Sequence, residues 1–184
     1  HGDEPAGNGL VWKLVSQLIT NENLLLGRKV LVLPIANPDA KAQNTRYNSQ
    51  KIDINRNFPA PNRVNSPDFG MEPLSQPESQ AIAEIIRKYQ PDRIVSIHQP
   101  YACIDYDGPA EDLAKQMAQY SNLPIKKLGA LPGSLGSYAG LQLKIPIITL
   151  ELPENASAIP TQKLWEIYGN TLLAAVIYPD DLQK

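Results

Sequence analysis

The sequence predicts an α/β fold with a mixed, largely parallel sheet flanked by helices. Two observations lead to this fold class. Short apolar runs typical of buried strands alternate with longer segments in which apolar residues recur at helical spacing. In addition, ionisable side chains stand directly after two of those runs. With 184 residues, 42% of them hydrophobic, the chain is long enough for a single domain over residues 1–184 with its own core.

The first part of the chain is expected to hold a helix, a strand and a long loop. Residues 7–20 are predicted to be helical because apolar residues repeat at three- and four-residue intervals: Leu10, Val11, Leu14, Val15, Leu18 and Ile19. Residues 29–35 are a short β-branched and leucine run, which predicts a buried strand. Residues 40–74 are rich in Asn, Arg and Pro and lack periodicity, so we expect a long loop, which in compact domains is usually functional.

Four helices are expected in the rest of the chain. The first begins at a capping-box pattern, with Ser75 as N-cap and Glu78 three residues later, and Pro91 ends it. The others are predicted from apolar spacing at residues 110–120, 137–142 and 161–178.

Two later strands each lead to an ionisable side chain. The strand predicted at residues 93–97 is followed by His98, and the strand predicted at residues 145–150 is followed by Glu151. Ligands of open α/β sheets bind beyond the carboxyl ends of the strands. We therefore expect His98 and Glu151 to lie at one functional site.

The composition excludes some classes of function. The formal net charge is −2 and no basic cluster stands out, so neither nucleic acid nor an anionic membrane surface is an expected partner. No apolar run reaches the ~20 residues that span a bilayer. Cys103 is the single cysteine, so no disulfide forms within the chain, as is usual in a reducing compartment.

The chain has only two histidines, and both are candidate metal ligands. His1 and Glu4 are three residues apart, so on one helical turn both can reach the same ion. With His98 they provide two imidazoles and a carboxylate, which can bind one Zn²⁺ and leave a position open for water. Glu151 would then accept the proton of that water. The alternatives are an acid-rich helix start, a hydrogen-bonded core histidine, and a carboxylate that reaches solvent.

The polar loop supplies candidates for the other roles. Arg56 and Asn55 would bind a substrate carboxylate, which arginine grips in a bidentate manner. Asp53 could accept the second ring proton of a zinc-bound histidine, and Arg46 could face the developing oxyanion. Taken singly, each of these side chains is equally explained by an ordinary salt bridge or hydrogen bond within the loop.

Taken together, these residues resemble the zinc metallocarboxypeptidase family. The family has four motifs in this order: an H-x-x-E sequence, an Asn-Arg pair, a histidine after a strand and a glutamate after a later strand. In this chain they correspond, in the same order, to His1 with Glu4, Asn55 with Arg56, His98, and Glu151. The resemblance runs to about Pro153 and implies a zinc carboxypeptidase-like fold and hydrolysis of an amide bond.

Within this family the chain resembles most the murein peptide amidases of bacteria. The stretches that carry this resemblance are residues 53–59, 96–100 with 102–104, and 132–137. It implies cleavage of the γ-D-glutamyl-meso-diaminopimelate bond of murein peptides during peptidoglycan recycling. A cytoplasmic location is expected, and a periplasmic one stays open because a leader could precede the sequence.

Three features depart from the family pattern. Gly136 stands where basic-specific carboxypeptidases carry an acidic residue. No position clearly matches the substrate-clasping tyrosine of digestive carboxypeptidases, for which Tyr101 and Tyr138 are the candidate substrate-binding substitutes. Family members also have sheet strands before the H-x-x-E motif, so the resemblance implies a sequence truncated at its N-terminus.

Two other functions stay open at this point. An N-acyl amino acid deacylase of the aspartoacylase or succinylglutamate desuccinylase type would share the H-x-x-E motif and the Asn-Arg pair. A non-catalytic module that binds cell-wall peptides would keep the fold, but it would have no need of Glu151 as a base. The oligomeric state is not determined by the sequence.

Overall fold

The strands form a mixed sheet, as the sequence predicted. The computed structural model describes residues 1–180 and 182. Within it, strand β1 (Ile94–His98) pairs in parallel with β3 (Ile147–Pro153), and β2 (Tyr101–Asp107) pairs with β3 in the antiparallel sense. The strand order is therefore β1-β3-β2, with β3 in the centre.

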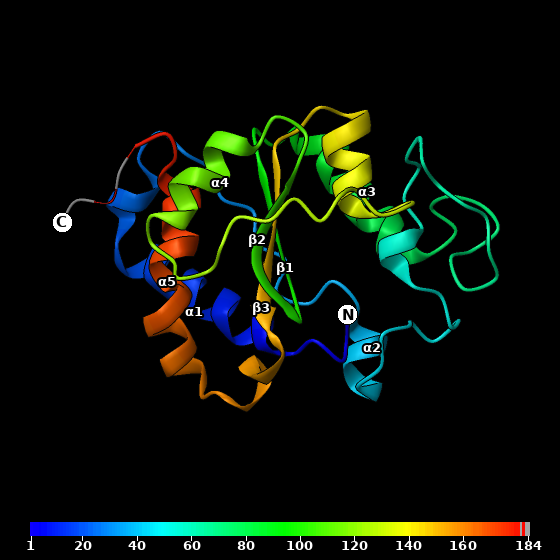
Figure 1. Ribbon diagram of the computed structural model, residues 1–184, viewed down its shortest axis with the longest axis horizontal. Helices are drawn as coiled ribbons and strands as arrows, with labels where there is room; N and C mark the ends of the chain where they lie inside the picture. Colours follow the sequence, from blue (N-terminus) through cyan, green and yellow to red (C-terminus); the bar gives the residue numbers. More distant parts are fainter. Residues whose placement is uncertain (181, 183–184) are drawn as a thin grey trace.

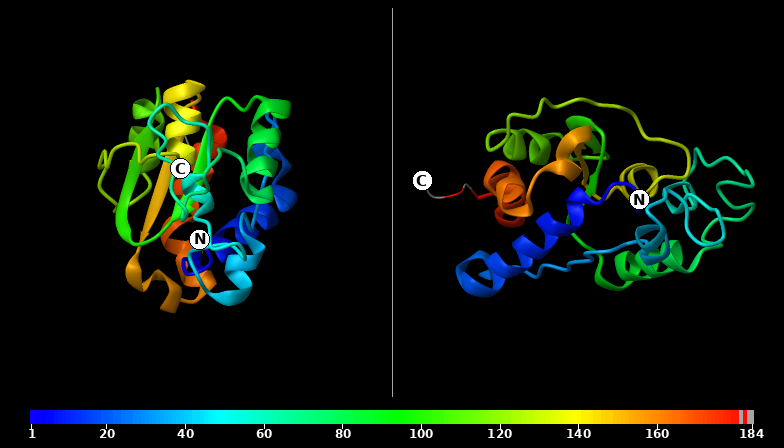
Figure 2. Two further views of the ribbon diagram at one scale, coloured as in Figure 1. Left: turned by 90° about the vertical axis from the view of Figure 1, so that its right-hand side faces the viewer. Right: turned by 90° about the horizontal axis from the view of Figure 1, so that it is seen from below.

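Helices lie on both sides of these strands, as Figures 1 and 2 show. The five α-helices are α1 (Ala6–Thr20), α2 (Pro38–Gln43), α3 (Pro77–Tyr89), α4 (Glu111–Ala118) and α5 (Thr161–Ile177). Helices α1, α4 and α5 lie on one side of the strands in Figure 1, and α2, α3 and the long loop lie on the other. The shorter helical turns are Glu22–Leu25, Ile54–Arg56, Ser137–Gln142 and Glu154–Ala158.

The two faces of the sheet differ in chemistry because successive side chains of a strand point in opposite directions. One face packs into the core with α1, α4 and α5, and its buried residues include Ile104, Ile148, Leu150 and Leu152. The other face lines a cleft with a volume of about 550 Å³, and its residues there are Ser96, His98, Tyr101, Asp105, Asp107, Thr149 and Glu151. The alternation therefore separates the hydrophobic core from the candidate site within the same strands.

The strand predicted at residues 29–35 does not form. No backbone hydrogen bond joins this segment to another strand among the described residues, and the Leu31 and Leu33 side chains are 45% and 49% exposed. Val30 and Val32 instead face an apolar groove along α1. The apolar run predicted a strand, but a strand also needs a neighbour for its backbone groups, which local sequence does not provide.

Strand β2 was missed because its sequence lacks a continuous apolar run. Its cleft-facing positions carry polar residues, while Ile104 on the other face is fully buried.

The predicted capping box is also wrong. Helix α3 begins at Pro77 with Gln76 as N-cap, and the Ser75 hydroxyl accepts a hydrogen bond from the Asn57 amide instead.

Across the described residues, none of the helices combines the length and apolar character needed to cross a bilayer.

Candidate metal centre and active-site cleft

A tight backbone contact fixes the position of the first candidate ligands. The Gly2 amide donates to the Thr45 carbonyl at 2.9 Å. A Cβ atom at Gly2 would lie only 2.0 Å from the Ala40 carbonyl oxygen, so a larger residue does not fit against α2. Figures 1 and 2 show the N-terminus beside this helix. The glycine therefore allows the H-x-x-E segment to reach the edge of the cleft.

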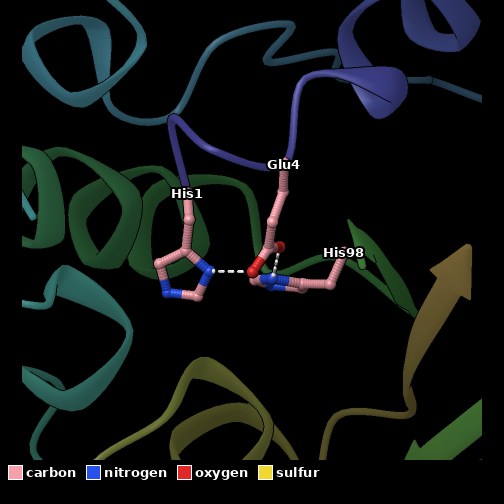
Figure 3. Close-up of side chains that lie close together, drawn as sticks. All are labelled: His1, Glu4 and His98. Atoms are coloured by element: carbon pink, nitrogen blue, oxygen red, sulfur yellow. Dashed lines mark hydrogen bonds and ion pairs between the residues drawn. The ribbon is translucent and has the colours of Figure 1, made fainter. Parts of the chain in front are cut away.

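The side chains of His1, Glu4 and His98 converge on one point (Figure 3). The Glu4 carboxylate lies between the two imidazole rings. Its Oε1 atom is 2.7 Å from Nδ1 of His1, and its Oε2 atom is 2.8 Å from Nδ1 of His98. Although 94 residues separate Glu4 from His98, the fold brings the three predicted ligands together.

This donor set fits a zinc ion. One potential ligand atom from each of the three side chains lies within 4.8 Å of the others. Around a tetrahedral zinc with bonds of ~2.0–2.1 Å, ligand atoms lie about 3.3 Å apart. The imidazole–carboxylate contacts would need to open by about 0.6 Å or less. Two imidazoles and a carboxylate also match the ligand types of catalytic zinc sites, which keep one position open.

Asp53 orients His1 from the side opposite Glu4. Its Oδ1 atom accepts from Nε2 of His1 at 3.1 Å and from the Asn55 amide at 2.9 Å, and its Oδ2 atom accepts from Nε of Arg46 at 2.8 Å. Burial alone would raise the pKa of Asp53, but the bond to His1 and the nearby positive charges lower it to about 2. Asp53 therefore stays ionised, as a partner that fixes a metal-binding imidazole must.

Contacts within this cluster shift the pKa values of His1 and Glu4. Burial opposes protonation of His1, but its hydrogen bonds to Asp53 and Glu4 outweigh this effect and raise its pKa to about 9. Burial likewise disfavours the Glu4 carboxylate, but the bonds from His1 and His98 lower the pKa of Glu4 well below its ordinary value. A bound dication would replace the imidazole protons in this balance.

Arg46 reaches the same group of charges from the long loop. Besides its bond to Asp53, its Nη1 atom is 3.6 Å from Oε1 of Glu4. The side chain is 34% exposed and lines the cleft. This placement leaves the guanidinium fixed at one end by Asp53 and open toward the cleft beside the candidate metal ligands.

Glu151 lies next to the metal ligands because of the sheet register. It is opposite His98 on β1 and opposite Cys103 on β2. The residue is 7% exposed, and its carboxyl group accepts a weak, 3.5 Å hydrogen bond from the Tyr101 amide. Burial, opposed by that amide but aided by the Glu4 charge, raises the pKa of Glu151 to about 7. A carboxyl group with this pKa can exchange a proton near neutral pH.

Asn55 and Arg56 also line the cleft. The Asn55 side-chain oxygen accepts from the Leu135 amide at 2.9 Å, and Nη1 of Arg56 donates to the Asn55 carbonyl at 2.6 Å. These bonds orient the pair while the remaining donors of the guanidinium and the Asn55 amide are available for a ligand carboxylate.

The two candidate tyrosines have different positions. Tyr101 lines the cleft and is 59% exposed. Tyr138 is not among the cleft-lining residues; its ring stacks on Phe58 with 5.8 Å between the ring centroids. The structure therefore brings Tyr101, and not Tyr138, to the site.

Sequence reasoning missed Gln99, which follows β1 and forms hydrogen bonds with the N-terminal segment that carries Glu4. Its backbone amide donates to Oε2 of Glu4 at 3.2 Å, and its side-chain oxygen accepts from the Ala6 amide at 3.2 Å. Both contacts join residues 93 or more positions apart. Gln99 lies in the stretch 96–100 that carries the family resemblance, but a polar residue after His98 did not by itself indicate a role.

Known proteins similar to this chain agree with the geometry. The family described as the Succinylglutamate desuccinylase/Aspartoacylase catalytic domain matches residues 1–161. The chain is 35% identical over 190 residues to murein peptide amidase A of Escherichia coli strain K12, which covers 94% of this chain and 76% of that protein. It is 32% identical over 145 residues to the protein of the same name from Vibrio campbellii, which covers 69% of this chain and 58% of that protein.

Solved structures lead to the same assignment. The crystal structure of the murein-tripeptide amidase of Escherichia coli O157 matches with a TM-score of 0.69 and 29% identity, covering 96% of this chain and 76% of that one. Carboxypeptidase A from Helicoverpa armigera shares the fold, with a TM-score of 0.72 at 18% identity over 96% of this chain and 60% of that one. The chain therefore belongs to the family of the succinylglutamate desuccinylase/aspartoacylase catalytic domain, is related to the murein peptide amidases, and has the fold of the metallocarboxypeptidases.

Proposed function

We propose that residues 1–184 form one catalytic domain that hydrolyses the γ-D-glutamyl-meso-diaminopimelate bond of murein peptides with one zinc ion. The observation that carries this proposal is the pairing, in one cleft, of a His-Glu-His ligand set with a nearby carboxyl group outside that set, Glu151. The similarity to murein peptide amidase A over most of the chain supports this choice of substrate.

His1, Glu4 and His98 would hold the ion. Bound there, zinc would lower the pKa of a coordinated water toward ~7 and polarise the amide carbonyl. Glu151 accepts the proton of the attacking water and then delivers it to the leaving amine, because its own pKa of about 7 suits both transfers. Arg46 donates to the oxyanion that forms on the carbonyl oxygen.

The remaining cleft residues bind the substrate. Arg56 and Asn55 hold the free carboxylate of the diaminopimelate residue, on the leaving-group side of the scissile bond. Tyr101, which lies at the mouth of the cleft, covers the bound peptide. Asp53 acts indirectly, because it fixes the imidazole of His1 and one end of the Arg46 guanidinium.

The decisive test is a Glu151→Gln variant. We expect it to keep one equivalent of zinc and to lose about 10²- to 10⁴-fold in the rate of γ-D-glutamyl-meso-diaminopimelate cleavage, the usual range for a general base. Metal content by mass spectrometry and product formation by liquid chromatography measure the two properties. Glu111→Gln, on the exposed surface of α4, is the matched control. Cleavage by Glu151→Gln at the parental rate would refute the general-base assignment.

A second candidate function follows from the matching family description. Succinylglutamate desuccinylase and aspartoacylase give that family its name, so an N-acyl amino acid deacylase is the alternative enzyme. Parallel assays with muropeptide, N-acetylaspartate and N-succinylglutamate separate the two. Faster cleavage of either acylated amino acid than of the muropeptide would replace the murein proposal.

A non-catalytic module that binds cell-wall peptides is the remaining alternative. It predicts less than one equivalent of zinc after gentle purification and no hydrolysis of any of the three substrates. The cytoplasmic location stays a prediction that fractionation of the native host would test.

A further inference from the structure

A buried amide side chain joins three segments at the metal end of the cleft. Gln99 directly follows the candidate ligand His98 at the end of β1, and it is 7% exposed. Because the strand order is β1-β3-β2, the chain between β1 and β2 crosses the carboxyl end of β3. Only two residues, Gln99 and Pro100, make this crossing. The crossing therefore brings the Gln99 side chain against the turn that follows β3.

The oxygen atom of this amide fixes the start of α1. Its Oε1 atom accepts a hydrogen bond from the Ala6 amide at 3.2 Å. Ala6 is the first residue of α1, and the N-cap residue, Pro5, makes no side-chain hydrogen bond to the helix. The first N–H groups of a helix have no partner within the helix, so Gln99 supplies an acceptor that the local sequence lacks. Since Glu4 lies two residues before Ala6, this bond also restricts the backbone that carries the candidate ligand.

The nitrogen atom of the same amide fixes the end of β3. Its Nε2 atom donates to the carbonyl oxygens of Pro153 and Glu154, at 3.4 and 3.3 Å. The Ser157 hydroxyl accepts from Nε2 and donates to Oε1, at 3.1 Å in each case, and so bridges the two ends of the amide. Pro153 is the last residue of β3 and lies two residues after Glu151. These bonds therefore hold the strand end that carries Glu151.

An amide matches both sets of contacts. It has two N–H donors for the carbonyl oxygens and an oxygen acceptor for the helix N–H. A carboxylate at this position would face the carbonyl oxygens of Pro153 and Glu154 with lone pairs alone, and it would add a negative charge near Glu4. A buried polar group whose donors and acceptors are all satisfied specifies one arrangement of the segments around it.

We infer that Gln99 is a positioning residue and that the Ser157 hydroxyl supports it. The amide holds the start of α1 and the end of β3 together, and this sets the spacing between the metal ligand Glu4 and the base Glu151. The inference rests on the proposed function, which gives these two carboxylates their roles. A displacement of about 1 Å caused by a change away from the reacting atoms can lower a rate by about 10²-fold, so this contact matters for turnover.

The test is a Gln99→Met variant, which keeps the length of the side chain and removes the amide. We expect the zinc dissociation constant to rise about 10- to 100-fold, the usual loss when a residue that orients a metal ligand is removed. We also expect kcat for γ-D-glutamyl-meso-diaminopimelate to fall about 10- to 100-fold, with KM changed by less than about twofold. Competition with a chromophoric chelator and steady-state kinetics measure these constants.

Thr171→Val separates positioning from a general loss of stability. The Thr171 hydroxyl donates to the Tyr120 carbonyl at 2.8 Å, and the residue is fully buried and does not line the cleft. The midpoint of thermal unfolding without metal should fall in both variants, but Thr171→Val should keep the zinc affinity and kcat of the wild type. Equal zinc dissociation constants in the two variants, or a raised KM with unaltered kcat in Gln99→Met, overturns the inference.

Ser157→Ala is a milder variant at an exposed residue. Loss of this hydroxyl should raise the zinc dissociation constant roughly two- to tenfold, as for one hydrogen bond. It should add little in the Gln99→Met background, because both changes remove the same contact. If Gln99→Met does not fold, an unchanged zinc affinity in Ser157→Ala overturns the inference. If the wild type cleaves no muropeptide but Gln99→Met binds zinc more weakly than Thr171→Val, the proposed function fails and the positioning of the metal ligand holds.

Discussion

The buried acids at the two ends of the cleft differ in whether they form ion pairs. At the metal end, the acids Glu4 and Asp53 are both bonded to histidine or arginine. At the far end, neither Asp105 nor Asp107 forms an ion pair within the described part of the chain, and exposed Lys127 only partly offsets the effect of burial on their pKa values. The difference teaches how pairing changes the effect of a buried charge: a buried charge that is paired fixes geometry, and one that is not paired is unfavourable in its ionised form.

The contacts at the metal end hold the candidate ligands close together. The Glu4 carboxylate is bonded to both His1 and His98, so the three side chains need little rearrangement to bind one cation. Preorganisation of this kind reduces the cost of binding.

Among changes to the residues at the metal end of the cleft, we expect the largest effect on kcat. Arg46→Gln removes the guanidinium that faces the cleft from the Asp53 side, and we expect kcat to fall by about 10²- to 10³-fold, the loss typical of one oxyanion donor. Steady-state kinetics on γ-D-glutamyl-meso-diaminopimelate measure it. Arg87→Gln on the exposed surface of α3 is the control. A change in KM with unaltered kcat would assign Arg46 to substrate binding instead.

A smaller effect is expected on metal affinity. Asp53→Asn keeps the shape of the side chain but removes the charge that orients His1, so the zinc dissociation constant should rise about 10- to 100-fold. Competition with a chromophoric chelator measures this constant. Asp68→Asn, an exposed position in the same loop, serves for comparison, and equal zinc affinity in the two variants would show that Asp53 has no such role.

The smallest effect is a gradual dependence on pH. Glu151 must be ionised to accept a proton, and burial raises its pKa to about 7. Activity should therefore fall as pH decreases through this value, about tenfold per pH unit below it, with the midpoint shifted lower by a nearby dication. The profile of kcat/KM between pH 5 and pH 9 checks this, and a flat acidic limb in the folded enzyme would argue against Glu151 as the base.

Much of the site was predictable because its chemistry depends on residue type and order. His98 and Glu151 were expected to follow strands, and His1 and Glu4 were expected to share one helical turn; these relations are visible in the sequence. In the structure His1 and Glu4 share a turn that precedes α1 and is not part of a helix. The structure confirms their convergence for the metal ligands. Asp53 beside His1 was also expected, since a metal-bound imidazole needs an acceptor for its second proton.

Other features depended on pairing between distant segments. Residues 29–35 have the composition of a strand but no neighbour to pair with, whereas β2 lacks an apolar run and is paired along its length. Tyr101 and Tyr138 were indistinguishable as candidates until the fold placed one at the cleft and stacked the other on Phe58.

The sequence alone therefore determined which side chains could bind a metal, and it predicted helices α1, α3, α4 and α5, because helical periodicity and ligand type are local properties. It did not predict α2, whose six residues are too few to show a helical period. Only the tertiary structure decided which face of each strand meets the cleft, and so it placed Asp107 opposite the metal end, in the space left by Gly136 and Gly140. The physical reason is that strand register and close backbone approach arise from contacts between segments far apart in the chain, which no local pattern encodes.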